Sequence, residues 1–173
     1  MHTVKVMDLP LTRLRDKGVP IDNLSNFSSA QEELLCVSNM EAVKNASLIF
    51  VTKSGMIKQV PGTEFDVIKR TIASTKLTEE DELVLVELCD TMDYVVLQSP
   101  AGYFLRFLKE ELTEKKKAAL GVRAMKMGDR DYLEHAYLLE SRMEYQIEYK
   151  EKQMVLNKIK LGKRDTKGTK VRV

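Results

Sequence analysis

Lysine and arginine residues placed close to glycines are the groups in this sequence with the most definite chemistry. Glycine leaves the neighbouring backbone open to close approach by a ligand. Guanidinium and ammonium groups in that setting suit phosphate, with which they form charge-assisted hydrogen bonds. The candidate phosphate-binding residues are Arg13, Arg15, Lys17, Lys69, Arg70, Lys76, Lys115, Lys116, Lys117, Arg123, Lys163, Arg164, Lys167, Lys170 and Arg172.

The whole chain is almost neutral, so this chemistry depends on how the charges are distributed. The sequence has 28 Lys and Arg against 26 Asp and Glu, a formal net charge of +2. From residue 151 to the end there are eight Lys or Arg and two acidic residues. A curved row of basic loops would neutralise the phosphates of a duplex through counterion release, without reading bases. The alternative is that each cluster is only a solvated rim.

Catalytic and metal-binding patterns are missing from the sequence. His2 is terminal, and His135 stands alone in LEHAYLL, where we expect an ordinary strand residue. There is no glycine-rich phosphate-binding motif. Cys36 and Cys89 lie in apolar runs without metal-binding spacing, so we expect both to be buried, reduced thiols. We therefore predict no catalytic residue, metal site or cofactor in this chain.

Two β-hairpins at a fixed interval position the basic clusters. Residues 47–65 read SLIFVTKSGMIKQVPGTEF, with a Ser-Gly turn between two strand-like runs. Forty-seven residues later the chain reads YVVLQSPAGYFLRFLKEEL, with Ala-Gly in the turn. A basic cluster follows each hairpin, which identifies a repeat protein. The last unit, from residue 144, is predicted to hold a hairpin without a turn glycine, then a basic loop and a final extended run.

Other strands are predicted by correspondence between the repeats. Residues 81–90, DELVLVELCD, match 131–141 and also 31–40, QEELLCVSNM. Since 84–86 are rich in β-branched residues, we expect all three segments to be strands. A Ser-x-x-Gln cap pattern leaves a helix as the local alternative for residues 28–43. The opening VKVMDLP is expected to be the last strand of a unit, leading into a basic loop at 13–18 that feeds another strand.

The segments that follow the two hairpins are expected to be loops or single turns. Residues 108–120 have the composition of a helix, with Gly121 as its C′ residue, but the matching residues 66–75 are poor helix sequence. The length of 173 residues suits three to four units of about 45 residues. We predict a single domain with units at 1–18, 19–70, 71–117 and 118–173. No apolar run of membrane-spanning length and no signal core occurs, so a cytoplasmic location is expected.

The order of these motifs resembles a known family. The segments VMDLPLTRLRDKGVPIDNL, SLIFVTKSGMIKQVPGTEF, IKRTIASTKL, DELVLVELCD, YVVLQSPAGYFLRF and ALGVRAMKMGDRDYL follow one another over nearly the whole chain. In that order they are similar to the C-terminal domain of the A subunit of bacterial type IIA topoisomerases, DNA gyrase or topoisomerase IV. No single segment is decisive, but their order is specific.

The resemblance implies an all-β fold, the β-pinwheel. This is a propeller-like arrangement of four-stranded blades that exchange a strand between neighbours, here with about three blades in an open arc or partial ring. It also implies that duplex DNA is gripped or bent along the basic rim and presented to a cleavage core for supercoiling, relaxation or decatenation. The implied partners are double-stranded DNA, the ATPase B subunit, and the rest of the A subunit, in a nucleoid-associated, cytoplasmic bacterial enzyme. ATP and Mg²⁺ would act elsewhere in that enzyme, and no membrane or small-molecule substrate is implied.

The sequence also departs from the family pattern. The gyrase-specific box QRRGGKG is absent, and RLRDKG and KRDTKG resemble its degenerate copies on other blades. The family's catalytic tyrosine lies in a separate domain and has no counterpart here. Family domains have five or six blades, so a fragment or a shortened relative is expected, and gyrase and topoisomerase IV both stay open. The alternative function is a propeller-like protein-interaction domain without a DNA role.

Overall fold

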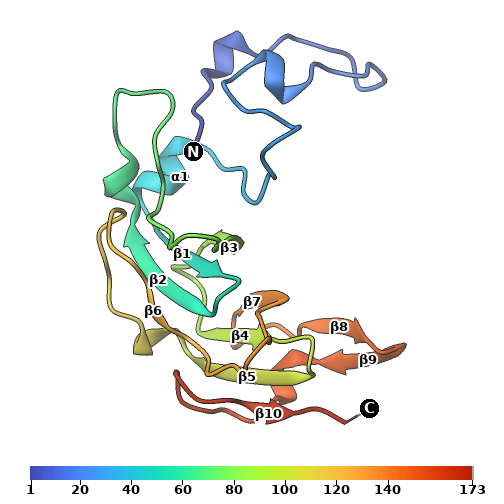
Figure 1. Cartoon of the computed structure of the whole chain (residues 1–173). Coiled ribbons are helices and arrows are strands. Elements are labelled where there is room, and N and C mark those ends of the chain that lie inside the picture. The colour runs from blue at the N-terminus through green and yellow to red at the C-terminus, as the bar shows by residue number, and fades with distance from the viewer. Residues whose placement is uncertain (173) are drawn as a thin grey trace.

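The computed structural model describes residues 1–172, which form an open arc of antiparallel sheets (Figure 1). Residues 1–39 lie at one end of the arc, two four-stranded sheets follow, and a two-stranded sheet lies near the other end. Helical segments are short, the longest being α1 (Met40–Lys44). The predicted all-β fold class is confirmed. No helix among the described residues is long and apolar enough to cross a membrane.

The first predicted hairpin forms the centre of the first sheet. β1 (Ser47–Thr52) pairs with β2 (Met56–Pro61), and Gly55 takes the φ of +85° that the turn requires. The sheet order is β3-β1-β2-β6, where β3 is Leu83–Leu88 and β6 is Val122–Arg123. The hairpin strands are therefore the inner pair, and the shorter β6 forms one edge.

The second sheet repeats this arrangement. β4 (Tyr94–Gln98) and β5 (Tyr103–Leu108) are its inner hairpin. β7 (His135–Leu139) pairs with β4, and β10 (Thr169–Lys170) pairs with β5. The predicted strands at 81–90 and 131–141 are confirmed as β3 and β7, with His135 as the first residue of β7.

Strands are exchanged between neighbouring repeats. In the chain β6 follows the second hairpin, yet it pairs with β2 of the first sheet. Likewise β10 follows the third hairpin and pairs with β5 of the second sheet. That third hairpin consists of β8 (Gln146–Tyr149) and β9 (Lys152–Val155), and its two-residue turn has positive φ at both positions, as a type I′ turn requires. The structure thus has two complete blades and a hairpin of a third.

The hydrophobic core lies between adjacent sheets. Ile49 and Val51 of β1 cluster with Val95 and Leu97 of β4 and with Phe107 of β5, and all five are almost fully buried. The opposite face of the first hairpin is covered by a second cluster around Phe50 and Phe65, so every residue of β1 is buried. A third cluster joins the β8–β9 hairpin to the second sheet. Each blade is therefore stabilised by its neighbour.

The expected strand at 31–40 is wrong. Residues 32–39 have no regular structure, and α1 begins at Met40, with the Asn39 side chain accepting a hydrogen bond from the Ala42 N–H at 2.7 Å. A strand requires a partner, and within residues 1–172 no hairpin lies beside this segment to pair with it. Cys36 is consequently exposed, which corrects the expected burial, whereas Cys89 is buried and burial raises its pKa to about 11.

Two further expectations at the N-terminus are also wrong. Val6–Asp8, within the expected opening strand, form a 3₁₀ turn, η1, and the basic loop at 13–18 leads to a second 3₁₀ turn, η2 (Ile21–Asn23), rather than to a strand. Like residues 31–40, these segments have no hairpin to extend in the described chain. An isolated bridge between His2 and Thr71, with backbone hydrogen bonds from Thr3 to Arg70 and between Met1 and Ile72, ties this end to the rest.

Single 3₁₀ turns follow every hairpin, as expected. They are η3 (Gly62–Phe65), η4 (Lys109–Glu111) and η5 (Leu156–Lys158). Gly121 does not end a helix. It lies against the backbone of β2, where a Cβ would come within 2.8 Å of the Ile57 carbonyl oxygen. The division into four units at 1–18, 19–70, 71–117 and 118–173 stays a prediction.

Candidate nucleic-acid interface

One basic loop is bound to the second strand of each complete hairpin, β2 or β5, by an equivalent backbone hydrogen bond. The Lys115 N–H donates to the Gln59 carbonyl at 2.8 Å, and 47 residues later the Gly162 N–H donates to the Arg106 carbonyl at 2.7 Å. Each loop then continues into the edge strand of that sheet, β6 or β10. We call residues 115–123 and 162–170 the outer loops. Their repeated anchoring gives both the same position on their blades.

The outer loops lie on the convex side of the arc (Figure 1). The opposite edges of the two sheets are β3 and β7, which contact one another on the concave side. Residues 115–123 contain four Lys or Arg and no acidic residue, and residues 162–170 contain four Lys or Arg and a single Asp. Positive charge is therefore concentrated along the outer edge.

One position is basic in all four repeats. A Lys or Arg precedes each of the loop residues Gly18, Ser74, Gly121 and Gly168 by five positions. All four side chains are exposed, and among the described residues none forms an ion pair or a side-chain hydrogen bond. We call these four residues the repeat cations: Arg13, Lys69, Lys116 and Lys163.

The repeat cations lie on different segments of the arc. Lys116 and Lys163 lie on the two outer loops, at equivalent positions of adjacent blades. Lys69 lies in the exposed loop that follows η3. Arg13 lies with Arg15 and Lys17 in the exposed segment at the far end of the arc. Lys116 and Lys163 are thus the best-positioned pair for a ligand that runs along the rim.

Two of the predicted binding residues hold the loops in place instead. The Lys117 ammonium group donates to the Glu64 carbonyl at 2.6 Å. At the equivalent position, an Arg164 guanidinium nitrogen donates to the Arg123 carbonyl at 2.6 Å. Both residues are half-buried. Their positive charge contributes to the local potential, but their donors are engaged with backbone.

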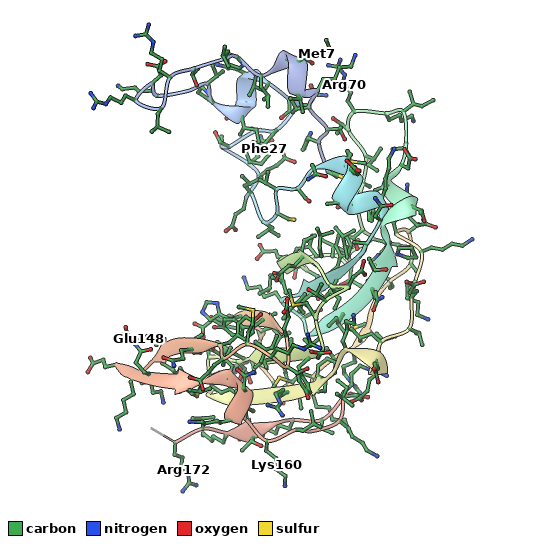
Figure 2. The ribbon with its side chains drawn as sticks, turned by 180° about the vertical axis from the view of Figure 1, so that it is seen from behind. Met7, Phe27, Arg70, Glu148, Lys160 and Arg172 are labelled. Carbon is green, nitrogen blue, oxygen red and sulfur yellow. The ribbon has the colours of Figure 1, made fainter. Side chains whose placement is uncertain are left out.

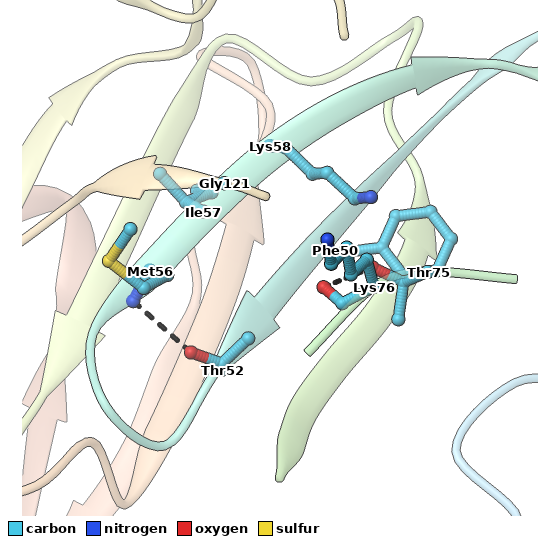
Figure 3. Close-up of a pocket in the computed structure, with 8 residues that line it drawn as sticks. All are labelled: Phe50, Thr52, Met56, Ile57, Lys58, Thr75, Lys76 and Gly121. Atoms are coloured by element: carbon cyan, nitrogen blue, oxygen red, sulfur yellow. Dashed lines mark hydrogen bonds between the residues drawn. The ribbon is translucent and has the colours of Figure 1, made fainter. Parts of the chain in front are cut away.

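Lys58 is a residue that sequence reasoning missed. Its side chain is 3% exposed, and its ammonium group donates to the carbonyls of Lys117 and Ala119 at 2.6 and 2.8 Å. Burial lowers its pKa, and the nearby Glu64 carboxylate opposes that shift. Figure 3 shows it beside Phe50. Nothing local distinguishes Lys58 from an ordinary exposed strand residue, because both acceptors lie about 60 residues away.

A salt bridge connects the two outer loops. Arg123 donates from two guanidinium nitrogens to the two carboxylate oxygens of Asp165. The pairing raises the pKa of Arg123 and lowers that of Asp165. Since both side chains are exposed, the pair is accessible to solvent and to competing anions. Arg70 makes a weaker contact of the same kind, 3.8 Å from Asp8.

The C-terminal cations lie beside an aromatic ring. The ammonium groups of Lys167 and Lys170 are 4.5 and 5.5 Å from the centre of the Tyr103 ring, within cation–π range. Figure 2 shows Arg172 and Lys160 on this edge of the molecule. Lys160 is exposed and was not among the predicted residues, although it lies three positions before Lys163. Of the remaining candidates, Lys76 is exposed and Lys115 is half-buried.

Comparison with known proteins gives consistent matches. The family model described as "DNA gyrase C-terminal domain, beta-propeller" matches residues 46–90 and 93–140. The A subunit of DNA gyrase from Lawsonia intracellularis is 25% identical over 83% of this chain, and that from Klebsiella oxytoca is 29% identical over 76%. The matched regions make up 18% and 15% of those proteins, so the chain spans less than a fifth of their length.

Solved structures agree with these matches. A crystal structure of the C-terminal domain of DNA topoisomerase IV superposes with a TM-score of 0.81 and 26% identity, over 95% of this chain and 53% of that one. A DNA gyrase A C-terminal domain superposes with a TM-score of 0.70 over 90% of this chain and 53% of that one, at 22% identity, which supports the fold.

Proposed function

We propose, from the premise that this chain belongs to the DNA gyrase C-terminal domain family, that it binds duplex DNA along its outer loops without sequence specificity. The observation that carries the proposal is a basic residue at the same position of every unit. Its side chain is exposed and forms no ion pair among the described residues. Two of its copies lie on loops that equivalent backbone hydrogen bonds hold in place. Spaced cations on a rigid curved edge suit phosphates, which recur regularly along a duplex.

The wider role follows from the same premise. We propose that the chain acts within a bacterial type II topoisomerase, where it grips or bends the DNA segment that other parts of the enzyme cleave and pass. Its protein partners would be the rest of the A subunit together with an ATPase B subunit, in the cytoplasm at the nucleoid. Strand cleavage, ATP and Mg²⁺ would belong to those other parts.

The binding residues fall into three groups under this proposal. Lys116 and Lys163 would contact phosphates directly from the outer loops. Lys117 and Arg164 would support the loops and add charge, because their donors are occupied by carbonyls. The remaining exposed cations without an ion pair would extend the contact, and they are Arg13, Arg15, Lys17, Lys69, Lys76, Lys167, Lys170 and Arg172. Arg70 and Arg123 would join them when a phosphate displaces Asp8 or Asp165.

The test compares two pairs of lysine substitutions that remove the same charge. One variant carries Lys116→Ala and Lys163→Ala, and its control carries Lys150→Ala and Lys152→Ala at the tip of the β8–β9 hairpin, away from the outer loops (Figure 1). Binding to a duplex longer than about 100 base pairs, long enough to follow a curved edge, is measured by fluorescence anisotropy at several salt concentrations. Each lost phosphate contact reduces the slope of log affinity against log salt by about 0.9.

The outcomes separate DNA binding from the alternative of a protein-interaction domain. We expect the slope to fall by about 1.8 for the outer-loop pair and to change little for the hairpin pair. If the unmodified chain did not bind duplex DNA at about 50 mM salt, where phosphate contacts are strong, the proposal would be wrong. Equal effects of the two pairs would exclude the outer loops as the binding surface.

A further inference from the structure

An acidic residue takes the same place in three of the 3₁₀ turns. Asp8 is the third residue of η1, Glu64 of η3 and Glu111 of η4. Acidic residues are favoured near the start of a helix, but η5 forms without one, because its third residue is Lys158. The turn itself therefore does not require the acid.

In η3 and η4 the acid lies against the residue that directly follows a repeat cation. The Arg164 N–H donates to Glu111 Oε2 at 2.9 Å, and the Lys117 N–H donates to Glu64 Oε2 at 3.5 Å. In both pairs the partners are 53 residues apart in sequence. The turn after one hairpin thus contacts the outer loop that follows the next hairpin or its equivalent.

The third acid makes a contact of a different kind. Asp8 approaches Arg70, which directly follows the repeat cation Lys69, but the contact is between the two side chains at 3.8 Å. Both side chains are exposed, and exposed pairs of this kind contribute little. The backbone contacts of Glu64 and Glu111 are therefore the ones that can hold a loop.

The second outer loop depends more on its acid than the first one does. Lys58 donates to two carbonyls of the first outer loop. Lys58 faces Phe50 as Leu105 faces Leu97 in the second sheet, so the equivalent of this lysine is a leucine without a donor. A separation of 2.9 Å is an ordinary hydrogen bond, whereas 3.5 Å is long. Glu111 is therefore the acid with the larger expected effect.

We propose, on the basis of the proposed DNA function, that Glu111 is a positioning residue that presents Lys163 to a phosphate. Its carboxylate accepts the N–H of the peptide that joins Lys163 to Arg164, which fixes the backbone from which the Lys163 side chain extends. Without this acceptor the partly buried N–H loses its partner, and the loop must be ordered when DNA binds. A loop that is ordered beforehand binds more tightly. Glu64 acts in the same way, more weakly, on Lys116.

This role is opposite to that of the other acid near the second outer loop. Asp165 is exposed and pairs with the guanidinium of Arg123, so it competes with phosphate for that side chain. Glu111 is half-buried and contacts the backbone, so the ammonium group of Lys163 stays free. Loss of the Glu111 acceptor should therefore weaken DNA binding, at equal net charge.

The test removes the charge and the acceptor of Glu111 separately. Glu111→Gln loses the charge but keeps an oxygen acceptor, whereas Glu111→Ala loses both. Glu110→Ala is the matched control, because Glu110 lies in the same turn, is exposed, and forms no ion pair or side-chain hydrogen bond among residues 1–172. All three variants change the net charge equally, and urea unfolding confirms that each is folded.

Duplex binding against salt concentration reports the number of phosphate contacts. We expect Glu111→Ala to reduce the slope of log affinity against log salt by about 0.9, because Lys163 is no longer held towards phosphate. Glu111→Gln and Glu110→Ala should keep the slope of the unmodified chain. Adding Lys163→Ala should reduce the slope in the Glu111→Gln chain and change it little in the Glu111→Ala chain, where the contact is already lost.

Amide exchange tests the hydrogen bond without DNA. The Arg164 amide should exchange about tenfold faster in Glu111→Ala than in Glu111→Gln, because only the glutamine still offers an acceptor. The amides of residues 115–121 in the first outer loop should exchange equally in both variants.

The results separate this role from the proposed function. If the unmodified chain did not bind duplex DNA, the proposed function and the role of Glu111 would both be wrong. If it bound DNA but Glu111→Ala and Glu111→Gln gave equal slopes, or equal exchange of the Arg164 amide, only the role of Glu111 would be wrong. An equal loss of slope in Glu110→Ala would also overturn it, because the effect would then come from charge alone.

Discussion

At the scale of single residues, Asp165 controls how available the nearest outer-loop arginine is. Its carboxylate accepts two hydrogen bonds from Arg123, so a DNA phosphate must displace it before it can bind that guanidinium. Exposed pairs of this kind contribute little to folding stability. We therefore expect Asp165→Asn to leave the free energy of unfolding almost unchanged and to raise DNA affinity.

A charge-matched control separates the release of Arg123 from the general loss of negative charge. Asp129→Asn removes the same charge at an exposed residue four positions after Met125 on the chain, without an ion-pair partner among the described residues. In a salt titration, Asp165→Asn should make the log–log slope steeper by about 0.9, one extra phosphate contact, and Asp129→Asn should not. If the two variants gave equal slopes, the prediction that Asp165 limits the access of phosphate to Arg123 would be wrong.

At the scale of elements, a buried lysine couples strand β2 to the first outer loop. Lys58 donates to two carbonyls of that loop, which would otherwise lack these partners. Lys58→Met keeps much of the apolar stem but removes both donors. We expect a loss of about 2 kcal/mol in the free energy of unfolding, as for hydrogen bonds from a charged group.

The control is Lys53→Met on the same hairpin, where the ammonium group is exposed and forms its ion pair with Glu82. Its effect should stay within about 0.5 kcal/mol. Urea unfolding measures both variants, and amide exchange of residues 115–121 should accelerate only in Lys58→Met. Unchanged exchange there would show that the loop is held without Lys58.

At the scale of the whole molecule, the short outer edge limits what the chain can do to DNA. Two backbone-anchored outer loops on adjacent blades provide few phosphate contacts, whereas smooth bending of a site of about 20 to 30 base pairs costs about 1 to 6 kcal/mol. We predict that the chain grips DNA without wrapping it chirally. Relaxed circular DNA treated with the chain and a nicking-closing enzyme should gain no supercoils of fixed sign, and supercoils of one sign would contradict this prediction.

Much of the blade architecture was predictable because its signals are local. Ser54-Gly55 and Ala101-Gly102 mark turns between alternating runs, and both hairpins form as expected. The strand-like composition of 31–40 was equally local, yet that segment has no strand, because a strand forms only where a partner edge is present. Local sequence signals therefore predict that a segment can form a strand, and the presence of a neighbouring strand decides whether it does.

The candidate interface likewise has features that the sequence predicts and features that only the folded chain shows. The recurrence of a basic residue at one position of each unit is visible in the sequence, since that pattern needs only the order of residues along the chain. In contrast, it takes the folded chain to show that Lys117, Arg164 and Lys58 donate to carbonyls while Lys116 and Lys163 are exposed to solvent. The reason is physical: the acceptors that engage these side chains lie about 40 to 60 residues away in sequence and meet them only when β6 and β10 cross to a neighbouring blade.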